Sequence, residues 1–125
     1  MTGPAGAATP RPTEIRVRRA ERRLDIAFDD GCHFELSAEL LRVESPSAEV
    51  KGHGPGQKKI VPGKRMVAIG GVEPVGRYAI RILFDDDHDT GLYSWSYLYE
   101  LGRDCAVRWQ AYLDALAERG LSRDG

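Results

Sequence analysis

The residues best suited to chemistry stand together in one acidic stretch, residues 85–91, which reads DDDHDTG. Hard cations such as Ca²⁺ favour clustered carboxylates, so this stretch predicts a metal site or a small metal-dependent activity. Its candidate ligands are Asp85, Asp87, His88 and Asp89. The spacing lacks the glycine and the distal glutamate of an EF-hand loop. The other interpretation, which the pattern favours, is an acidic hairpin turn exposed to solvent.

The remaining cysteine and histidine spacings predict neither a metal centre nor a catalytic site. Two cysteines, Cys32 and Cys105, and three histidines occur without any CxxC or HExxH pair. His33 and Glu35 imitate one half of an iron-binding facial triad, but the second histidine of such a site has no match. Cys105, at the start of an expected helix, is favoured as a small buried side chain. The chain is therefore expected not to be an enzyme.

Two other features indicate a binding surface. Tyr93 and Trp95 belong to an aromatic run, and alternate side chains of an extended chain face opposite ways, so some are expected at the surface. Exposed tyrosine and tryptophan side chains are typical of protein interfaces. The glycine-rich residues 52–59 add a histidine and two lysines, although they do not fit the phosphate-binding P-loop pattern. The predicted partner-binding residues are His88, Tyr93, Trp95, His53, Lys58 and Lys59.

Composition and charge exclude several classes of partner. The 125 residues predict one domain, and a formal net charge of −1 gives no overall attraction to nucleic acid or anionic membrane. The five arginines between residues 16 and 23 lack interleaved aromatic residues, so nucleic-acid binding is not expected. No apolar run reaches the ~18 residues of a membrane-spanning helix. Without an export signal or a disulfide framework, the expected compartment is the cytoplasm.

The hydrophobic pattern predicts a single α+β domain over residues 14–121, between a disordered tail at residues 1–13 and a short tail at residues 122–125. About five or six mostly antiparallel strands are expected to form a sheet on which a C-terminal amphipathic helix packs. The expected strands lie near residues 14–18, 24–28, 32–36, 66–73, 78–84 and 92–95. Asp30-Gly31 predicts a tight hairpin, and the Gly- and Pro-rich residues 44–64 predict a long loop.

Helices are expected after the third strand and after the last strand. Ser37 can cap a short helix over residues 38–43, and residues 96–101 predict one helical turn. A longer amphipathic helix is expected over residues 104–119, and Gly120 stands where a helix C-terminus favours glycine. The apolar stripe of this helix comprises Trp109, Tyr112, Leu113 and Leu116.

Three segments together resemble the γ-butyrobetaine hydroxylase-like N-terminal domain family. They are FDDGCHFELSAELLRVESPSAEVKGHGPGQ, VEPVGRYAIRILFDDDHDTGLYSW, and SYLYELG followed by the helix that contains Trp109. The resemblance covers about residues 15–120 and implies a small bacterial domain of unassigned function. A similar domain precedes the oxygenase domain of γ-butyrobetaine and trimethyllysine hydroxylases and is appended to some Mrp-type iron–sulfur carrier ATPases.

In those hydroxylases the resemblance implies a structural zinc, held by a Cys-Pro-Cys-x-x-Cys cluster and a later histidine. In this sequence the cluster falls on Ser45, Ser47 and Val50, and the histidine falls on His88. Serine hydroxyls do not ionise near neutral pH and valine has no donor atom, so no zinc and no other cofactor is expected. Packing or hydrogen bonds must then hold the Ser45 loop to the His88 turn.

The resemblance also suggests a function. We expect a non-catalytic accessory module that docks on an unidentified protein partner, and the fusions with carrier ATPases imply an iron–sulfur carrier or one of its clients. The alternative is a metal-binding protein, or a small metal-dependent activity, centred on His88 and its acidic turn. Binding of zinc, iron(II) or calcium would distinguish the two.

Overall fold

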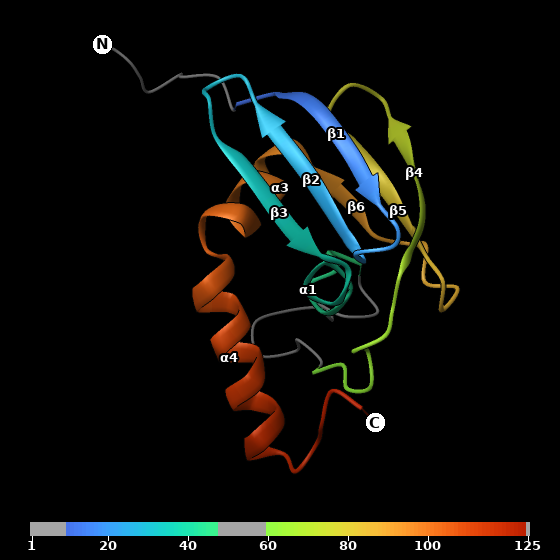
Figure 1. Cartoon of the computed structure of the whole chain (residues 1–125), viewed down its shortest axis with the longest axis vertical. Helices are drawn as coiled ribbons and strands as arrows, with labels where there is room; N and C mark the ends of the chain where they lie inside the picture. The colour runs from blue at the N-terminus through green and yellow to red at the C-terminus, as the bar shows by residue number, and fades with distance from the viewer. Residues whose placement is uncertain (1–9, 48–59, 125) are drawn as a thin grey trace.

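A computed structural model of the protein describes residues 10–47 and 60–124. These described residues form six strands, a short helix after the third strand and two helices after the sixth (Figure 1). The predicted α+β class is therefore confirmed. Among the described residues, no helix is both long enough and apolar enough to cross a membrane.

The first sheet is antiparallel, with the strand order β1-β2-β3. Its strands are β1 Pro12–Arg18, β2 Arg23–Phe28 and β3 His33–Ser37. Side chains alternate across a strand, so β2 buries Leu24, Ile26 and Phe28 in the core while Asp25 lies on the opposite, outer face. The predicted hairpin joins β2 to β3, where Gly31 takes the positive φ of 90° that glycine allows.

The second sheet is also antiparallel, with the strand order β4-β5-β6. Its strands are β4 Ile69–Val75, β5 Ala79–Phe84 and β6 Leu92–Ser94. Ile80, Ile82 and Phe84 of β5 join the buried residues of β2 in one core cluster. The strands thus form two three-stranded sheets whose apolar faces share a core, and Figure 1 shows β5 and β6 behind the first sheet. Arg19 also donates a hydrogen bond to the carbonyl of Gly70 at 2.7 Å.

The helices are α1 Ala38–Val43, α3 Trp95–Arg103 and α4 Cys105–Glu118. The Ser37 hydroxyl accepts a hydrogen bond from the Leu40 amide at 3.0 Å, which confirms the predicted cap of α1. α3 begins one residue before the predicted turn, where the Ser94 hydroxyl caps it by accepting from the Tyr97 amide at 3.1 Å, and it continues past the predicted end to Arg103. Gly120 has a φ of 66°, which is the left-handed conformation that commonly ends a helix.

The predicted apolar stripe of α4 packs mainly in a second, smaller hydrophobic cluster. Tyr112 and Leu116 are buried in a second cluster with Val43 of α1 and the neighbouring residues 60–61. The Tyr112 hydroxyl donates to the Val61 carbonyl at 2.6 Å. α4 therefore holds α1 and the chain that leads into β4, and Figure 1 shows it beside the lower end of the first sheet.

The hydrogen-bonded chain extends past both predicted domain boundaries. The Arg11 amide donates to Asp29 at 3.2 Å, and β1 begins at Pro12. At the other end, the Gly63 amide donates to the Ser122 carbonyl at 3.0 Å. Arg123 donates two hydrogen bonds to Glu39, at 2.7 and 2.8 Å. Residues 122–124, which were expected to be a tail, are thus part of the packed structure.

Candidate functional site

Three residues that the resemblance aligns with the zinc ligands of the hydroxylases lie side by side in the structure. Ser45 Oγ is 2.9 Å from His88 Nε2, and Ser47 Oγ is 3.5 Å from the same nitrogen. All three side chains are buried, and Ser45 is completely inaccessible. We call Ser45, Ser47 and His88 the polar cluster. The prediction that hydrogen bonds join the Ser45 loop to the His88 turn is confirmed, whereas Val50 lies outside the described residues.

Local structure brings the two halves of the polar cluster together. The amide of Ser45 donates to the Arg42 carbonyl at the end of α1, which turns the chain toward the second sheet. The His88 carbonyl accepts from the Phe84 amide at 3.1 Å, closing the turn after β5. A Cβ added at Gly91 would lie 2.5 Å from Ser45 Oγ, a distance that real Cβ atoms essentially never show. Glycine at position 91 therefore permits the close approach of the turn to Ser45.

The donor set of the polar cluster does not fit zinc. Two neutral hydroxyls and one imidazole lack the ionised ligands that a tetrahedral zinc site needs. Across residues 10–47 and 60–124, no group of three or more His, Cys, Asp or Glu side chains is arranged to hold a metal ion. A serine within hydrogen-bond distance of a histidine resembles a nucleophile and its base, but the complete burial of Ser45 leaves no access for a substrate.

The acidic turn uses two of its carboxylates for protein hydrogen bonds. Asp85 accepts from the Ala68 amide at 3.0 Å. Asp86 accepts from Arg42 at 2.8 Å and from Lys64 at 2.6 Å. Burial would raise the pKa of Asp86, but the hydrogen bonds from Lys64 and Arg42 outweigh it and lower the pKa to about 2. Metal binding by this turn stays a prediction, and these bonds compete with it.

Two residues of the predicted partner-binding face have buried side chains that a partner cannot contact. Tyr93 is completely buried, and its hydroxyl donates to the Leu41 carbonyl at 2.5 Å. Burial raises the pKa of this phenol well above its ordinary value. His88 is only 6% exposed. Their assignment as partner-contacting residues is therefore corrected, because β6 turns Tyr93 toward the core and the polar cluster holds His88 inside.

Trp95 keeps a partly exposed position beside a residue that sequence reasoning did not select. Its indole nitrogen donates to the Arg77 carbonyl at 2.7 Å, and its amide donates to the Tyr78 carbonyl at 2.9 Å. The Tyr78 side chain is 70% exposed. The predicted contacts His53, Lys58 and Lys59 lie outside the described residues.

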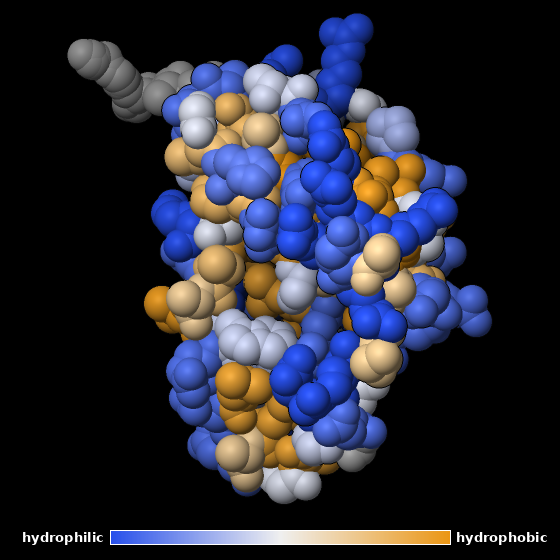
Figure 2. Space-filling model, viewed as in Figure 1, coloured by the Kyte–Doolittle hydropathy of each residue, from blue (hydrophilic) through white to orange (hydrophobic). Residues whose placement is uncertain are grey.

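An open groove with a partly apolar lining lies between β3, α1 and α4. It has a volume of about 390 Å³. Its lining residues, which define the Trp109 groove, are Glu35, Ser37, Glu39, Leu40, Cys105, Ala106, Trp109 and Arg123. Figure 2 shows a hollow with hydrophobic side chains on this face, between the sheet and the C-terminal helix. The Arg123 guanidinium stands 5.1 Å from the Trp109 ring centroid and forms the wall of the groove.

Sequence reasoning missed this groove for two reasons. Trp109 was expected to be covered by the core, and Arg123 was assigned to a tail. The sequence does contain a relevant signal: Arg123 follows the end of the helix closely enough to fold back on Trp109 and pair with Glu39.

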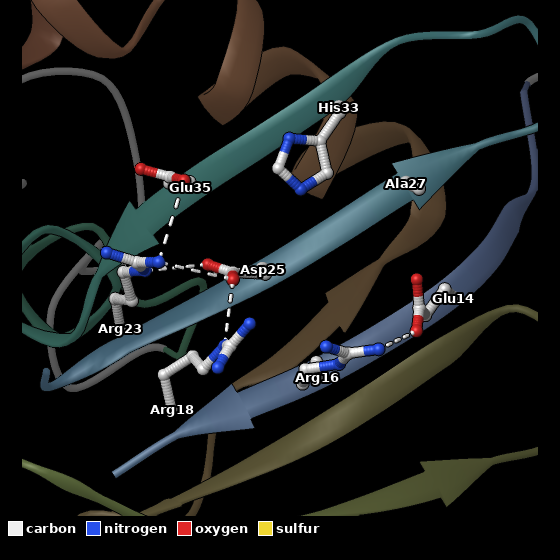
Figure 3. Close-up of a pocket in the computed structure, with 8 residues that line it drawn as sticks. All are labelled: Glu14, Arg16, Arg18, Arg23, Asp25, Ala27, His33 and Glu35. Atoms are coloured by element: carbon white, nitrogen blue, oxygen red, sulfur yellow. Dashed lines mark hydrogen bonds and ion pairs between the residues drawn. The ribbon is translucent and has the colours of Figure 1, made fainter. Parts of the chain in front are cut away.

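The outer face of the first sheet carries a charged hollow of about 200 Å³ (Figure 3). Its lining residues are Glu14, Arg16, Arg18, Arg23, Asp25, Ala27, His33 and Glu35. Asp25 accepts from Arg23 at 2.8 Å and from Arg18 at 3.2 Å, and the hydrogen bond from Arg23 is the largest cause of its lowered pKa. Carboxylates on the sheet thus pair with these arginines, and the expectation that this patch does not bind nucleic acid stays a prediction.

The profile of a family described as gamma-butyrobetaine hydroxylase-like, N-terminal, matches residues 15–99. None of the curated proteins compared matches the chain.

Three solved structures resemble the chain closely enough to support its fold. Two are described only as NMR solution structures. The first is 44% identical with a TM-score of 0.82, covering 94% of this chain and 92% of its own. The second is 46% identical with a TM-score of 0.81, covering 98% and 91%. The third is a crystal structure of a DUF971-family protein of unknown function from Acidithiobacillus ferrooxidans, 38% identical with a TM-score of 0.63, covering 74% and 92%.

Proposed function

We propose that this chain, which belongs to the gamma-butyrobetaine hydroxylase-like N-terminal family, is a non-catalytic accessory module that binds a protein partner. The observation that carries the proposal is the Trp109 groove. The residues that could take part in catalysis also support a non-catalytic role. The polar cluster is buried, and Asp85 and Asp86 already accept hydrogen bonds from other residues of the protein. The partner that the family resemblance suggests is an iron–sulfur carrier or one of its clients.

The Trp109 groove has the size and lining of a recognition site for a peptide side chain. Its volume lies in the range of roughly 300–1,000 Å³ that is typical of ligand pockets. Leu40, Ala106 and Trp109 supply apolar surface, and partly exposed tryptophans are common among the residues that dominate binding energy. The groove therefore suits an apolar anchor residue of a partner segment.

The rim of the groove favours a basic residue next to that anchor. Glu39 is neutralised within the chain by two hydrogen bonds from Arg123. Glu35 stands at the same rim with 55% of its side chain exposed, and its ion pair with Arg23 is long at 3.6 Å. Charge complementarity therefore favours a partner segment in which a lysine or arginine flanks a large apolar residue.

Affinity capture with matched variants tests this proposal. Ala106→Glu places a charged side chain in the groove, whereas Ala111→Glu places the same side chain on an exposed position of α4 outside it. We expect proteins captured by the wild type to be lost with Ala106→Glu and kept with Ala111→Glu, and mass spectrometry to identify an iron–sulfur protein among them. Direct binding of that protein should then weaken about tenfold or more with Ala106→Glu.

A third variant separates the groove from the other exposed aromatic surface. If Tyr78→Ala abolishes capture and Ala106→Glu does not, the module binds proteins through the Trp95 side and the groove is the wrong surface. An unchanged set of captured proteins with every variant would contradict the binding proposal. Calorimetric titration with zinc, iron(II) and calcium tests the metal alternative, since stoichiometric micromolar binding would favour it.

A further inference from the structure

A second polar site joins three segments that are far apart in the sequence. Arg42 lies in the last turn of α1, Lys64 precedes β4, and Asp86 lies in the turn after β5. Arg42 Nε and Lys64 Nζ both approach the same oxygen, Asp86 Oδ2, at 2.8 and 2.6 Å. The other oxygen of Asp86 accepts from the His88 amide at 3.2 Å. One carboxylate thus faces two cations.

Among the three side chains in direct contact, two carry a positive charge and one carries a negative charge. Asp86 neutralises one of the two positive charges, and both of its oxygens already accept hydrogen bonds. Arg42 Nη1 is buried and finds no hydrogen-bond acceptor among the residues that the structure describes. A guanidinium nitrogen buried without an acceptor is unfavourable, and charged donors suffer the largest loss. The missing partner is therefore an acceptor, and the positive charges of Arg42 and Lys64 favour one that is negatively charged, against the repulsion of Asp85 and Asp87 in the same turn.

We propose that Arg42 and Lys64 form a binding site for an oxyanion, either a phosphate or a carboxylate. Arginine is suited to such groups because its planar guanidinium presents several donors to their oxygens, and lysine adds a compact charge. The site reaches solvent through the side chains of Lys64 and Asp86, which keep 22% and 21% of their surface exposed. It is separate in its residues from the Trp109 groove, so its failure would leave the proposed function untouched.

Titration of the isotope-labelled protein with inorganic phosphate and with acetate tests the proposal, with sodium chloride at equal ionic strength as the reference. We expect saturable amide shifts around Arg42, Lys64 and His88, and a rise in Tm beyond that caused by chloride, because a ligand that binds the folded state stabilises it. Tighter binding of phosphate than of acetate would assign the site to phosphate groups. Equal or tighter binding of acetate would assign it to carboxylates.

Three variants keep the result specific to these residues. Arg42→Gln and Lys64→Gln each remove one cation and should weaken binding about tenfold, as the loss of one charged hydrogen bond implies. Lys64→Gln is informative even if Arg42→Gln does not fold. Arg81→Gln, which changes an arginine paired with Glu73 on the sheet, should leave binding unchanged. The proposal is overturned if phosphate and acetate act no differently from chloride, or if Lys64→Gln binds as well as the wild type.

Discussion

Polar side chains occupy opposite positions in the turn around His88 and in the Trp109 groove: they are inside the protein in the turn and at the solvent-exposed rim in the groove. In the turn they lie inside the protein, where Ser45 and Ser47 bond to His88 and Asp86 accepts from Arg42 and Lys64. In the groove they stand at the rim, and apolar side chains form the open floor. The first region therefore contributes to stability, and the second leaves apolar surface open to solvent. Substitutions should separate these two roles.

Removing the imidazole should have the largest effect on stability. In His88→Ala the hydroxyl of Ser45 loses one of its partners while it keeps the longer hydrogen bond from the Ser47 amide, and a cavity remains. We expect the free energy of unfolding to fall by about 2–4 kcal/mol. Urea denaturation measures it, with the exposed His33→Ala as a control that should change stability by less than about 0.5 kcal/mol. A His88→Ala protein as stable as that control would mean that the polar cluster does not hold the two segments together.

Adding one methyl group at Gly91 should have the next largest effect. The new Cβ would meet Ser45 Oγ at 2.5 Å, so the turn or the serine has to move. Gly91→Ala should destabilise the fold by about 1–3 kcal/mol. Gly71→Ala, whose nearest neighbour would be 4.0 Å away, is the matched control. Part of the loss should return in the double variant with Ser45→Ala, because the two sites are in contact. Strict additivity of the two changes would show that Ser45 is not the obstacle.

Acid should weaken the turn through Asp86. Its pKa in the folded state, about 2, lies below the ordinary value of 3.8. Its stabilisation is therefore complete above the unfolded pKa and is lost as the pH falls through the folded pKa. After allowance for solvent screening, the loss is about 1–2 kcal/mol.

The measurement compares the free energy of unfolding of the wild type with that of Asp86→Asn between neutral pH and about pH 2. The difference between the two proteins should shrink as the pH falls below the ordinary value of 3.8. Asp114→Asn on α4 serves as the control. A wild-type advantage that stays constant down to the lowest pH would argue against these ion pairs.

Substitution in the Trp109 groove should change the free energy of unfolding less than the substitutions above. Ala106 is exposed on α4, so Ala106→Glu should alter the free energy of unfolding by no more than about 0.5 kcal/mol, as should Ala111→Glu. Thermal denaturation of both variants checks this. A large loss in Ala106→Glu alone would show that the groove is part of the packed core, and its effect on partner capture would then have no specific meaning.

Local patterns predicted much of the secondary structure. The alternation of Leu24, Ile26 and Phe28 marks a strand with one buried face, and the structure has that strand and that face. Ser37 and Gly120 mark helix ends because their preferences depend on backbone geometry within a few residues. The division of the strands into two sheets was not predictable in this way, because strand pairing depends on contacts between distant segments.

The candidate site shows the same limit at the level of single side chains. Ser45 and Ser47, which the family resemblance grouped with His88, do lie within hydrogen-bond distance of it. The prediction that the Tyr93 side chain lies on a contact surface was wrong, because this side chain is buried. Alternation along an extended chain says only that neighbours face opposite ways, and the packing of β6 decides which of them is inside.

The sequence by itself determined the family, the α+β class, the turns and helix caps, and the presence of serines at positions where the family resemblance implies zinc-binding cysteines. Each of these depends on residue types and spacing within a short stretch or within a matched motif. Only the tertiary structure decided that His88 and Tyr93 are buried, that Arg123 folds back on Trp109, and that Arg42 shares Asp86 with Lys64. Burial and charge pairing depend on the neighbours that folding supplies, and these neighbours come from other segments of the chain.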